Sequence, residues 1–295
     1  MSNKTKILLL GGEGFIGRNI SDLLARDYDC FSVGRSKPIF PGSRAQFIAA
    51  DPYKETISGR YDVVIQLSDK SLQLDASDSL GLPDIEKAEK RILKNLDLIM
   101  PKQVIFFSTA NVYLSPDSKY ARAKLLIEDI YRKYCQKKHI GLSILRLFNI
   151  FGPYQLPYAK GTKKYKRGSL VAKIIYSYFA KEPIEINDLN AQRDFIYSLD
   201  MAKCIQVIIE RKLFGIDDLA TNKMITIGEL LSKINLFLPQ DIKFTDKNIN
   251  EETCPAADSR VIKLIRPSEL EKSLEKTVNF YKNNWPLIKA IQNAK

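Results

Sequence analysis

Residues 6–17 read KILLLGGEGFIG, an apolar run that ends in a glycine-rich turn. The run at residues 7–10 predicts a buried β-strand, and the glycines that follow predict a tight turn into a helix. Gly11, Gly14 and Gly17 give the spacing Gly-x-x-Gly-x-x-Gly. Such a turn lets the backbone approach a diphosphate closely, and the helix N-terminus stabilises its negative charge. The stretch therefore predicts a dinucleotide-binding site.

Short apolar runs alternate with helical patterns through the first half of the chain. After the opening strand and a helix to about Arg26, strands are expected at residues 30–33, 46–48, 62–67, 104–107 and 143–148. This alternation favours βαβ units and a parallel sheet. Most of the runs are continuously hydrophobic, as a sheet covered by helices on both faces requires. The sequence therefore predicts an α/β fold with a doubly wound parallel (Rossmann) sheet.

The pattern changes after Pro153. A basic loop is followed by a helix at 170–181, short strands near Ile184 and Phe195, and helices at 199–210, 226–237 and 269–283, with Thr226 as an expected N-cap. We expect residues 1–150, joined by about 190–222, to form the dinucleotide-binding domain. Residues 151–189 and 223–295 would form a smaller C-terminal α/β domain for the substrate.

The composition bounds the class of protein. With 295 residues, 45% of them hydrophobic and 27% charged, the chain is typical of soluble globular proteins. No apolar stretch approaches the roughly 18 residues of a membrane span, and the run at 7–10 is too short for a signal peptide. Four scattered cysteines without CxxC spacing argue against a zinc site or a disulfide framework. We expect a cytoplasmic protein without a membrane or metal partner.

The net charge of +12 favours anionic partners. The densest basic cluster, YAKGTKKYKRGS at residues 158–169, is either a solvated surface loop or a clamp on a diphosphate. The remaining excess is diffuse, and aromatic residues do not interleave with basic ones as on nucleic-acid platforms. No nucleic-acid partner is expected.

The end of the second strand bears on the choice of dinucleotide. An acid about 20 residues beyond the glycines usually holds the ribose hydroxyls of NAD, whereas an arginine there accommodates the 2′-phosphate of NADP. Here Arg35 and Ser36 follow Gly34, and no carboxylate stands at that strand end. NADP(H) is therefore the preferred cofactor and NAD(H) the other possibility. Asp51, after the third strand, could contact the adenine amine or serve as a turn residue before Pro52.

Tyr120 and Lys124 lie four residues apart in SKYARAK, so they share one face of a helix. A free tyrosine has a pKa near 10, and use near pH 7 requires a shift of about 3 units, or ~4 kcal/mol. A cation about 4 Å away at an effective dielectric near 20 supplies energy of that size. We expect Lys124, helped by the charge of an oxidised nicotinamide, to lower the pKa of Tyr120.

Five blocks occur in a fixed order: GGEGFIG, VIFFSTANVY at 104–113, Tyr120-x-x-x-Lys124, LRLFNIFGP at 145–153 and RDFIYSLDMA at 193–202. With these blocks the chain resembles the extended short-chain dehydrogenase/reductase family over nearly its whole length, specifically its nucleotide-sugar epimerases, dehydratases and reductases. The resemblance implies an NAD(P)-dependent enzyme with a nucleotide-sugar substrate.

The resemblance also implies catalytic roles. Thr109 would hydrogen-bond the reacting sugar oxygen, with Ser108 as the fallback, and Tyr120 would be the acid or base on that oxygen. Lys124 would lower the pKa of Tyr120 and hold the nicotinamide ribose. The implied cofactor-binding set is Gly11, Gly14, Phe15, Ile16, Gly17, Arg35, Ser36, Asp51, Leu67 and Lys124.

For the substrate, the resemblance implies that Asn149 contacts the sugar nucleotide and that Arg193 binds its diphosphate. The structural alternatives are a turn-capping role for Asn149 and an ion pair between Arg193 and Asp194. The family often dimerises through the helix that carries the catalytic pair, so we expect a homodimer. The stripe Leu126, Ile127, Ile130 and Tyr134 could supply that contact or belong to the core.

Departures from the family pattern help to choose a reaction. Ala110 and Asn111 follow Thr109 where family dehydratases carry an Asp-Glu pair, so a 4,6-dehydratase is disfavoured, and Gln66 and Ser68 replace the usual His and Ala. Since an arginine favours NADPH, the first choice is reduction of a 4-keto, often 6-deoxy, nucleotide hexose. The alternatives are a nucleotide-hexose 4-epimerase with tightly bound NAD and a non-catalytic Rossmann sensor or RNA-binding protein.

Overall fold

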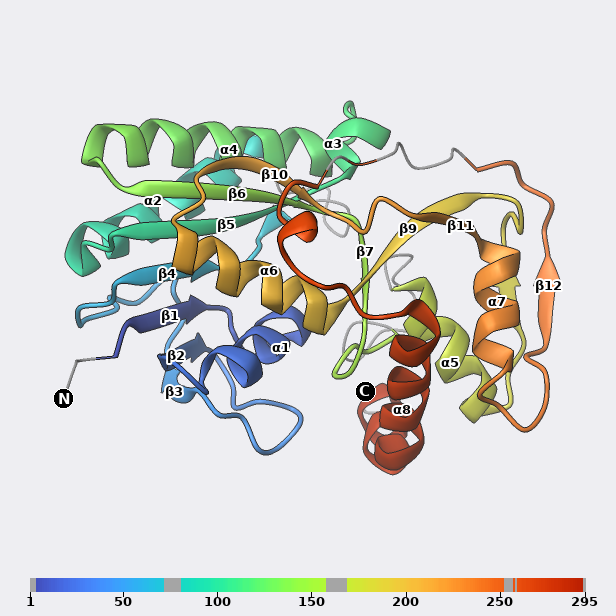
Figure 1. Cartoon of the computed structure of the whole chain (residues 1–295). Helices are drawn as coiled ribbons and strands as arrows, with labels where there is room; N and C mark the ends of the chain where they lie inside the picture. Colours follow the sequence, from blue (N-terminus) through green and yellow to red (C-terminus); the bar gives the residue numbers. More distant parts are fainter. Residues whose placement is uncertain (1–3, 72–80, 158–168, 252–256, 258, 294–295) are drawn as a thin grey trace. The chain divides into compact units, whose positions relative to one another are not determined.

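Two units make up the fold, and Figure 1 draws them in colours that follow the sequence. The computed structural model describes residues 4–71, 81–157, 169–251, 257 and 259–293. The first unit comprises Met1–Leu147, Ala202–Leu219 and Ser259–Ile265, and the second comprises Phe148–Met201, Ala220–Asp258 and Arg266–Lys295. The basic cluster at 158–168 lies outside the described residues.

A parallel sheet of seven strands forms the centre of the first unit, in the order β10-β6-β5-β4-β1-β2-β3. The strands are β1 (Lys6–Leu10), β2 (Asp29–Gly34), β3 (Gln46–Ala49), β4 (Val63–Gln66), β5 (Gln103–Thr109), β6 (Gly141–Leu147) and β10 (Gly215–Leu219). The strand order reverses between β1 and β4. In open α/β sheets, ligands bind at the carboxyl ends of the strands beside such a reversal.

Helices cover both faces of this sheet. They are α1 (Phe15–Leu24), α2 (Leu82–Ile99), α3 (Asn111–Leu114), α4 (Lys119–Lys138) and α6 (Ser198–Arg211). In Figure 1, α2 and α4 lie on one face, whereas α1 and α6 lie on the other. The predicted doubly wound α/β fold is confirmed.

Helix α4 is fixed by its cap and by its apolar face. The hydroxyl of Ser118 accepts a hydrogen bond from the N–H of Ala121 and caps the N-terminus. Ile127, Ile130 and Tyr134 pack against the core beneath α2 and α4. Of these three, Ile127 is a buried core residue, whereas Ile130 and Tyr134 are only partly buried against the core.

The loop after β2 is tied to α1 through one arginine. Arg18 is buried, and its guanidinium donates to the carbonyl oxygens of Phe40 at 2.8 Å and Pro41 at 3.0 Å. Its Nε also pairs with Asp22 at 2.9 Å. The loop is thereby anchored to the helix that follows the glycine-rich turn.

The second unit has a three-stranded sheet, β11-β9-β7, and a two-stranded sheet, β12-β8. Its strands are β7 (Asn149–Phe151), β8 (Ile184–Ile186), β9 (Gln192–Tyr197), β11 (Met224–Thr226) and β12 (Phe244–Asp246), and its helices are α5 (Leu170–Ala180), α7 (Ile227–Asn235) and α8 (Leu270–Asn293). Thr226 caps α7 as predicted, because its hydroxyl accepts from the N–H of Glu229 while that carboxylate accepts from the N–H of Thr226.

Helix α8 corrects one prediction. The helix was expected to end at residue 283, but it continues through Pro286 to Asn293. A proline inside a helix removes one backbone hydrogen bond. Ile288 and Ile291 beyond the proline are buried, so the apolar face of the helix continues past it and stabilises the last turns.

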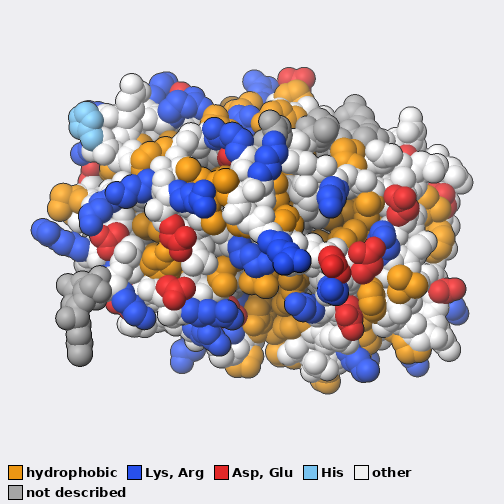
Figure 2. Space-filling model, in the orientation of Figure 1, with side chains coloured by type: hydrophobic (Ala, Val, Ile, Leu, Met, Phe, Trp, Pro, Cys, Tyr) orange, Lys and Arg blue, Asp and Glu red, His pale blue; other side chains and the backbone are white. Residues whose placement is uncertain are grey.

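The surface carries dispersed charge. On the face drawn in Figure 2, Lys and Arg side chains are interspersed with acidic and hydrophobic ones rather than gathered in one patch. Among the described residues, no helix combines the length and the apolar character needed to cross a membrane.

Candidate active site

The glycine-rich turn between β1 and α1 is packed so closely at Gly11 and Gly17 that no side chain would fit at these two positions. Gly11 has φ +80°, and a Cβ there would lie 2.7 Å from the backbone nitrogen of Ser68. A Cβ on Gly17 would lie 2.4 Å from the carbonyl oxygen of Gly12, whereas one on Gly14 would meet only a carbonyl at 3.9 Å. The turn is therefore tight on its protein side and open at Gly14, the N-cap of α1. This cradle fits a dinucleotide diphosphate at a helix N-terminus.

The other predicted cofactor residues lie at the carboxyl edge of the same sheet. Phe15 and Ile16 begin α1 and are partly buried. Leu67 follows β4, and its N–H donates to the carbonyl oxygen of Leu10 at 2.9 Å. Arg35 and Ser36 follow β2 and are exposed.

Asp51 is placed as a turn residue. One of its carboxylate oxygens accepts from the N–H of Tyr53 at 3.0 Å, and its own N–H donates to Glu55 at 2.7 Å. This was the structural alternative for Asp51, and an adenine contact through this residue stays a prediction.

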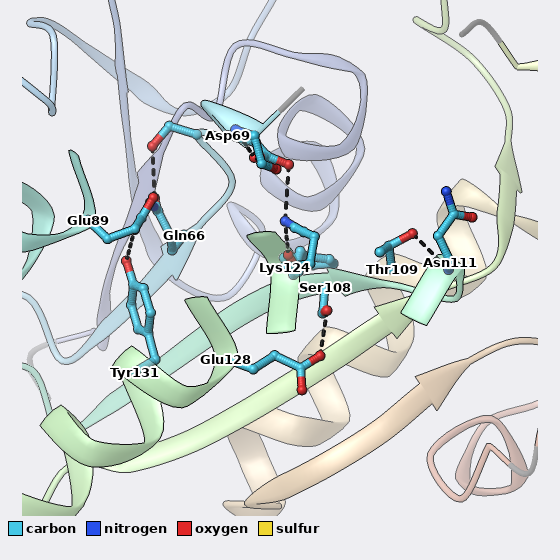
Figure 3. A network of polar contacts seen from close by, with 12 residues as sticks. Gln66, Asp69, Glu89, Ser108, Thr109, Asn111, Lys124, Glu128 and Tyr131 are labelled. Carbon is cyan, nitrogen blue, oxygen red and sulfur yellow. Dashed lines mark hydrogen bonds and ion pairs between the residues drawn. The ribbon is translucent and has the colours of Figure 1, made fainter. Parts of the chain in front are cut away.

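Lys124 is the most deeply buried of the predicted catalytic residues. Its ammonium donates to the carbonyl oxygen of Phe107 at 2.7 Å and to Asp69 at 3.0 Å, as Figure 3 shows. It also lies 4.8 Å from the centre of the Phe106 ring. Asp69 was not among the predicted site residues, although its place just after β4 brings it to the catalytic helix.

Each member of this ion pair favours the charged form of the other. Burial alone would lower the pKa of Lys124, but Asp69 and Tyr120 raise it above its ordinary value. Burial would likewise raise the pKa of Asp69, but Lys124 and hydrogen bonds from Ser71 bring it below its ordinary value. The pair is therefore ionised at neutral pH.

Tyr120 departs from the expectation for its acidity. Burial raises the pKa of Tyr120 above its ordinary value, and Lys124 lowers it too little to compensate. Asp69 adds to the rise, while a hydrogen bond with Thr109 opposes it. The expected direction of the Lys124 effect is correct, but the protein alone keeps Tyr120 a neutral phenol, the form that can donate a proton.

Thr109 and Ser108 end β5 and have different partners. The Thr109 hydroxyl accepts from the N–H of Asn111 at 3.2 Å. The Ser108 hydroxyl donates to Glu128 at 2.6 Å, and Arg146 holds the same carboxylate through two bonds of 3.0 and 2.8 Å. Ser108 therefore helps to tie β5, α4 and β6 together, which favours Thr109 over Ser108 for contact with a substrate.

A third acid with protein donors, Glu89, lies near the same helix. Glu89 of α2 accepts from the hydroxyl of Tyr131 at 3.1 Å and from that of Tyr53 at 3.4 Å. Figure 3 shows the bond from Tyr131. Burial raises the pKa of Glu89 to about 7, because the hydrogen bonds and the charge of Lys124 offset only part of the desolvation.

Asn149 and Arg193, two of the predicted substrate residues, belong to the second unit, whereas Ser108 belongs to the first. The amide of Asn149 donates to the carbonyl oxygen of Asp194 at 3.1 Å, and Arg193 pairs with Glu251 at 2.8 Å. Both the N–H and the hydroxyl of Thr221 donate to the carboxylate of Asp194 at 2.8 Å. Arg193 thus has an acidic partner other than the one considered from sequence.

Comparisons with known proteins identify the family of the chain. The model of the NAD dependent epimerase/dehydratase family matches residues 7–217. A Methanocaldococcus jannaschii protein provisionally named a UDP-glucose 4-epimerase is 25% identical over 316 aligned residues, covering 94% of this chain and 99% of the relative. The GDP-6-deoxy-D-talose 4-dehydrogenase of Aggregatibacter actinomycetemcomitans is 24% identical over 274 residues, covering 85% and 86%.

A solved structure supports the fold. The UDP-N-acetylglucosamine 4-epimerase from Methanobrevibacter ruminantium M1, in complex with UDP-N-acetylmuramic acid, superposes with a TM-score of 0.77 at 23% identity, covering 96% of this chain and 100% of the other. At this identity the likeness is one of fold. Because one family model spans the glycine-rich turn, Thr109, Tyr120 and Lys124, the chain belongs to the NAD dependent epimerase/dehydratase family, whose members are extended short-chain dehydrogenase/reductase enzymes.

Proposed function

We propose that the protein is a nucleotide-hexose 4-epimerase that keeps its dinucleotide bound. The observation that carries the proposal is the arrangement of Tyr120 on α4, hydrogen-bonded to Thr109 and one helical turn from the buried ammonium of Lys124. An acid and base of this kind can take a proton from a sugar hydroxyl and return it. The names of two of the three similar proteins described above are those of nucleotide-sugar 4-epimerases.

Each residue has a role in this proposal. The turn at Gly11, Gly14 and Gly17 holds the diphosphate of the dinucleotide, and Lys124 orients the nicotinamide ribose. When bound, the dinucleotide supplies a hydride acceptor and a positive charge near the phenol. Tyr120 exchanges the proton of the sugar 4-hydroxyl at its Oη, and Thr109 hydrogen-bonds the same oxygen.

Substrate binding is assigned to the second unit. Asn149 contacts the sugar nucleotide and Arg193 binds its diphosphate, for which Glu251 holds the guanidinium in place through a bond of 2.8 Å. An arginine fork is well matched to two phosphate oxygens. The expected homodimer is kept as a prediction, with a contact that does not use Ile127, which is buried in the core.

Elimination of water does not fit these residues. Ala110 has no ionisable group, and Asn111 contributes its backbone N–H to Thr109. Neither side chain can protonate a leaving hydroxyl, so a dehydratase reaction is left out of the proposal.

Reduction of a 4-keto nucleotide hexose, the first choice from sequence, is the second candidate. It is favoured by the exposed Arg35 and Ser36 after β2 and by the likeness to a 4-dehydrogenase of a GDP-6-deoxy sugar. The same Tyr120 would then give a proton to the developing alkoxide. The epimerase is preferred because the family model is that of NAD dependent enzymes.

The test is a panel of UDP-, GDP-, dTDP- and CDP-hexoses and their 4-keto derivatives, with products separated by chromatography. We expect inversion of configuration at C4 of the hexose without net consumption of dinucleotide. Tyr120→Phe should reduce turnover by roughly 10²- to 10⁴-fold while dinucleotide binding persists. Tyr134→Phe removes a hydroxyl from the same helix and should leave turnover unchanged. Steady consumption of NADPH with a 4-keto sugar, and no epimerisation at C4, would establish the reductase instead.

A further inference from the structure

Glu13 stands inside the glycine-rich turn, between Gly12 and Gly14, and its carboxylate is one of a few buried polar groups without a partner among the described residues. Both carboxylate oxygens are buried, and neither has a hydrogen-bond partner in the described part of the chain. Burying a charged group without a partner is unfavourable. A side chain kept in this state marks a place where donors can come from a ligand.

The carboxylate lies near the end of β2. A Cβ added to Gly34, the last residue of that strand, would lie 3.0 Å from the Cγ of Glu13 and 3.6 Å from its Cβ. Glu13 therefore passes over Gly34, and the absence of a side chain at Gly34 makes room for it. The turn between β1 and α1 thus brings an acid to the strand end where the sequence itself has none.

The position of this acid matters because of what binds there in dinucleotide folds. An acid at the end of the second strand hydrogen-bonds the ribose hydroxyls of NAD, and an arginine there accommodates the 2′-phosphate of NADP. The exposed Arg35 forms no ion pair with Glu13 among the described residues. The charge of Glu13 is therefore not compensated by Arg35, the residue from which the preference for NADP was inferred.

We propose that Glu13 accepts hydrogen bonds from the 2′- and 3′-hydroxyls of the adenosine ribose and so selects NAD over NADP. This inference rests on the dinucleotide site of the proposed function. Two adjacent hydroxyls offer two O–H donors to the two carboxylate oxygens. A 2′-phosphate removes one donor and places a like charge against a buried carboxylate, which is strongly unfavourable. The preference for NADP(H) drawn from Arg35 is replaced by a preference for NAD(H).

The first experiment is titration calorimetry of NAD⁺ and NADP⁺ into protein freed of bound dinucleotide. The native chain should bind NAD⁺ more tightly. Glu13→Gln keeps the shape but loses the charge, so its affinity for NAD⁺ should fall by roughly 10- to 100-fold, the effect of one or two charged hydrogen bonds. Its affinity for NADP⁺ should rise. Glu86→Gln removes a partly exposed charge from α2 and should change neither affinity.

The second experiment needs no dinucleotide. Because the buried carboxylate lacks a partner, Glu13→Gln should raise the thermal unfolding midpoint of the protein alone. The additional rise caused by saturating NAD⁺ should be smaller in the variant than in the native chain, since the variant binds the ligand more weakly. A loss of folding in the variant would appear here as a lower midpoint and would contradict the proposal.

The outcomes separate this inference from the proposed function. Equal affinity of the native chain for the two dinucleotides, or an unchanged preference in Glu13→Gln, would overturn the role of Glu13. Selective binding of NAD⁺ without any epimerisation at C4 would support the role of Glu13 in dinucleotide selection and contradict the proposed epimerase activity. Absence of binding by either dinucleotide would contradict both.

Discussion

The acids around α4 and the acid in the glycine-rich turn differ in one respect. Asp69, Glu89 and Glu128 are each held by donors from the protein: an ammonium, two phenols, and a guanidinium with a serine hydroxyl. Glu13 has buried oxygens and no donor among the described residues. Acids with internal partners maintain the fold and set the charge near Tyr120, whereas an acid without one indicates a ligand. This difference can be tested by substituting the partner Lys124 in one variant and the acids Glu89 and Asp69 in others.

The largest effect is expected from Lys124→Met, which leaves Asp69 buried without its cation. Breaking a buried ion pair from one side costs about 3–5 kcal/mol of unfolding free energy. Urea denaturation followed by circular dichroism measures this loss.

The double variant Lys124→Met with Asp69→Asn serves as the control. It removes both charges, so we expect it to recover most of the lost unfolding free energy. If the double variant is as unstable as Lys124→Met, the destabilisation does not come from an unpaired Asp69.

An effect of about 3 kcal/mol that depends on pH is expected at Glu89. The pKa of this carboxyl is about 7 in the folded chain against 4.5 ordinarily. Between these values the folded chain still holds a proton that the unfolded chain has released, so stability falls as pH rises and levels off above 7. Glu89→Gln should lack this fall, so its stability relative to the native chain should increase between roughly pH 5 and pH 8. Urea denaturation at a series of pH values measures this difference.

The partly exposed Glu86 on the same helix supplies the matched control for this prediction. Glu86→Gln should follow the native pH dependence of unfolding. If the unfolding free energy of the native chain does not fall relative to that of Glu89→Gln over this pH range, then ionisation of Glu89 does not destabilise the folded chain.

The smallest measured change is expected in the pKa of one phenol, and Asp69→Asn is the variant that tests it. This substitution also breaks the buried pair with Lys124, so it lowers the unfolding free energy as well. Burial raises the pKa of Tyr120, and the negative charge of Asp69 adds to that rise. Removing this charge should lower the pKa of Tyr120 and shift the pH profile of turnover to lower pH. Fluorotyrosine placed at position 120 and followed by fluorine NMR would report the same shift directly. A pKa that stays or rises would contradict the assigned influence of Asp69.

Local patterns were sufficient to predict most of the fold. The apolar run before Gly11 and the later runs predicted strands of the first sheet, since a strand buried on both faces is continuously hydrophobic. The end of α8 was missed because Pro286 is a local stop signal, whereas the burial of Ile288 and Ile291 depends on the tertiary fold.

The candidate site was predicted less completely, for the same reason. Tyr120 and Lys124 are one turn apart, so sequence alone places them on one helix face. Asp69 meets Lys124 across a separation of 55 residues, which no local pattern contains. The direction of the Tyr120 pKa depends on its burial, and the meeting of Glu13 with Gly34 depends on the pairing of β1 with β2.

The two carbonyl contacts of Arg18 have a kinetic consequence. Because the segment at Phe40 and Pro41 is already immobilised on α1, a ligand arriving beside β2 meets a surface that needs no ordering of that segment. Association should therefore be a single diffusive encounter rather than capture followed by slow rearrangement, and Arg18→Ala should introduce a second, slower phase in stopped-flow traces.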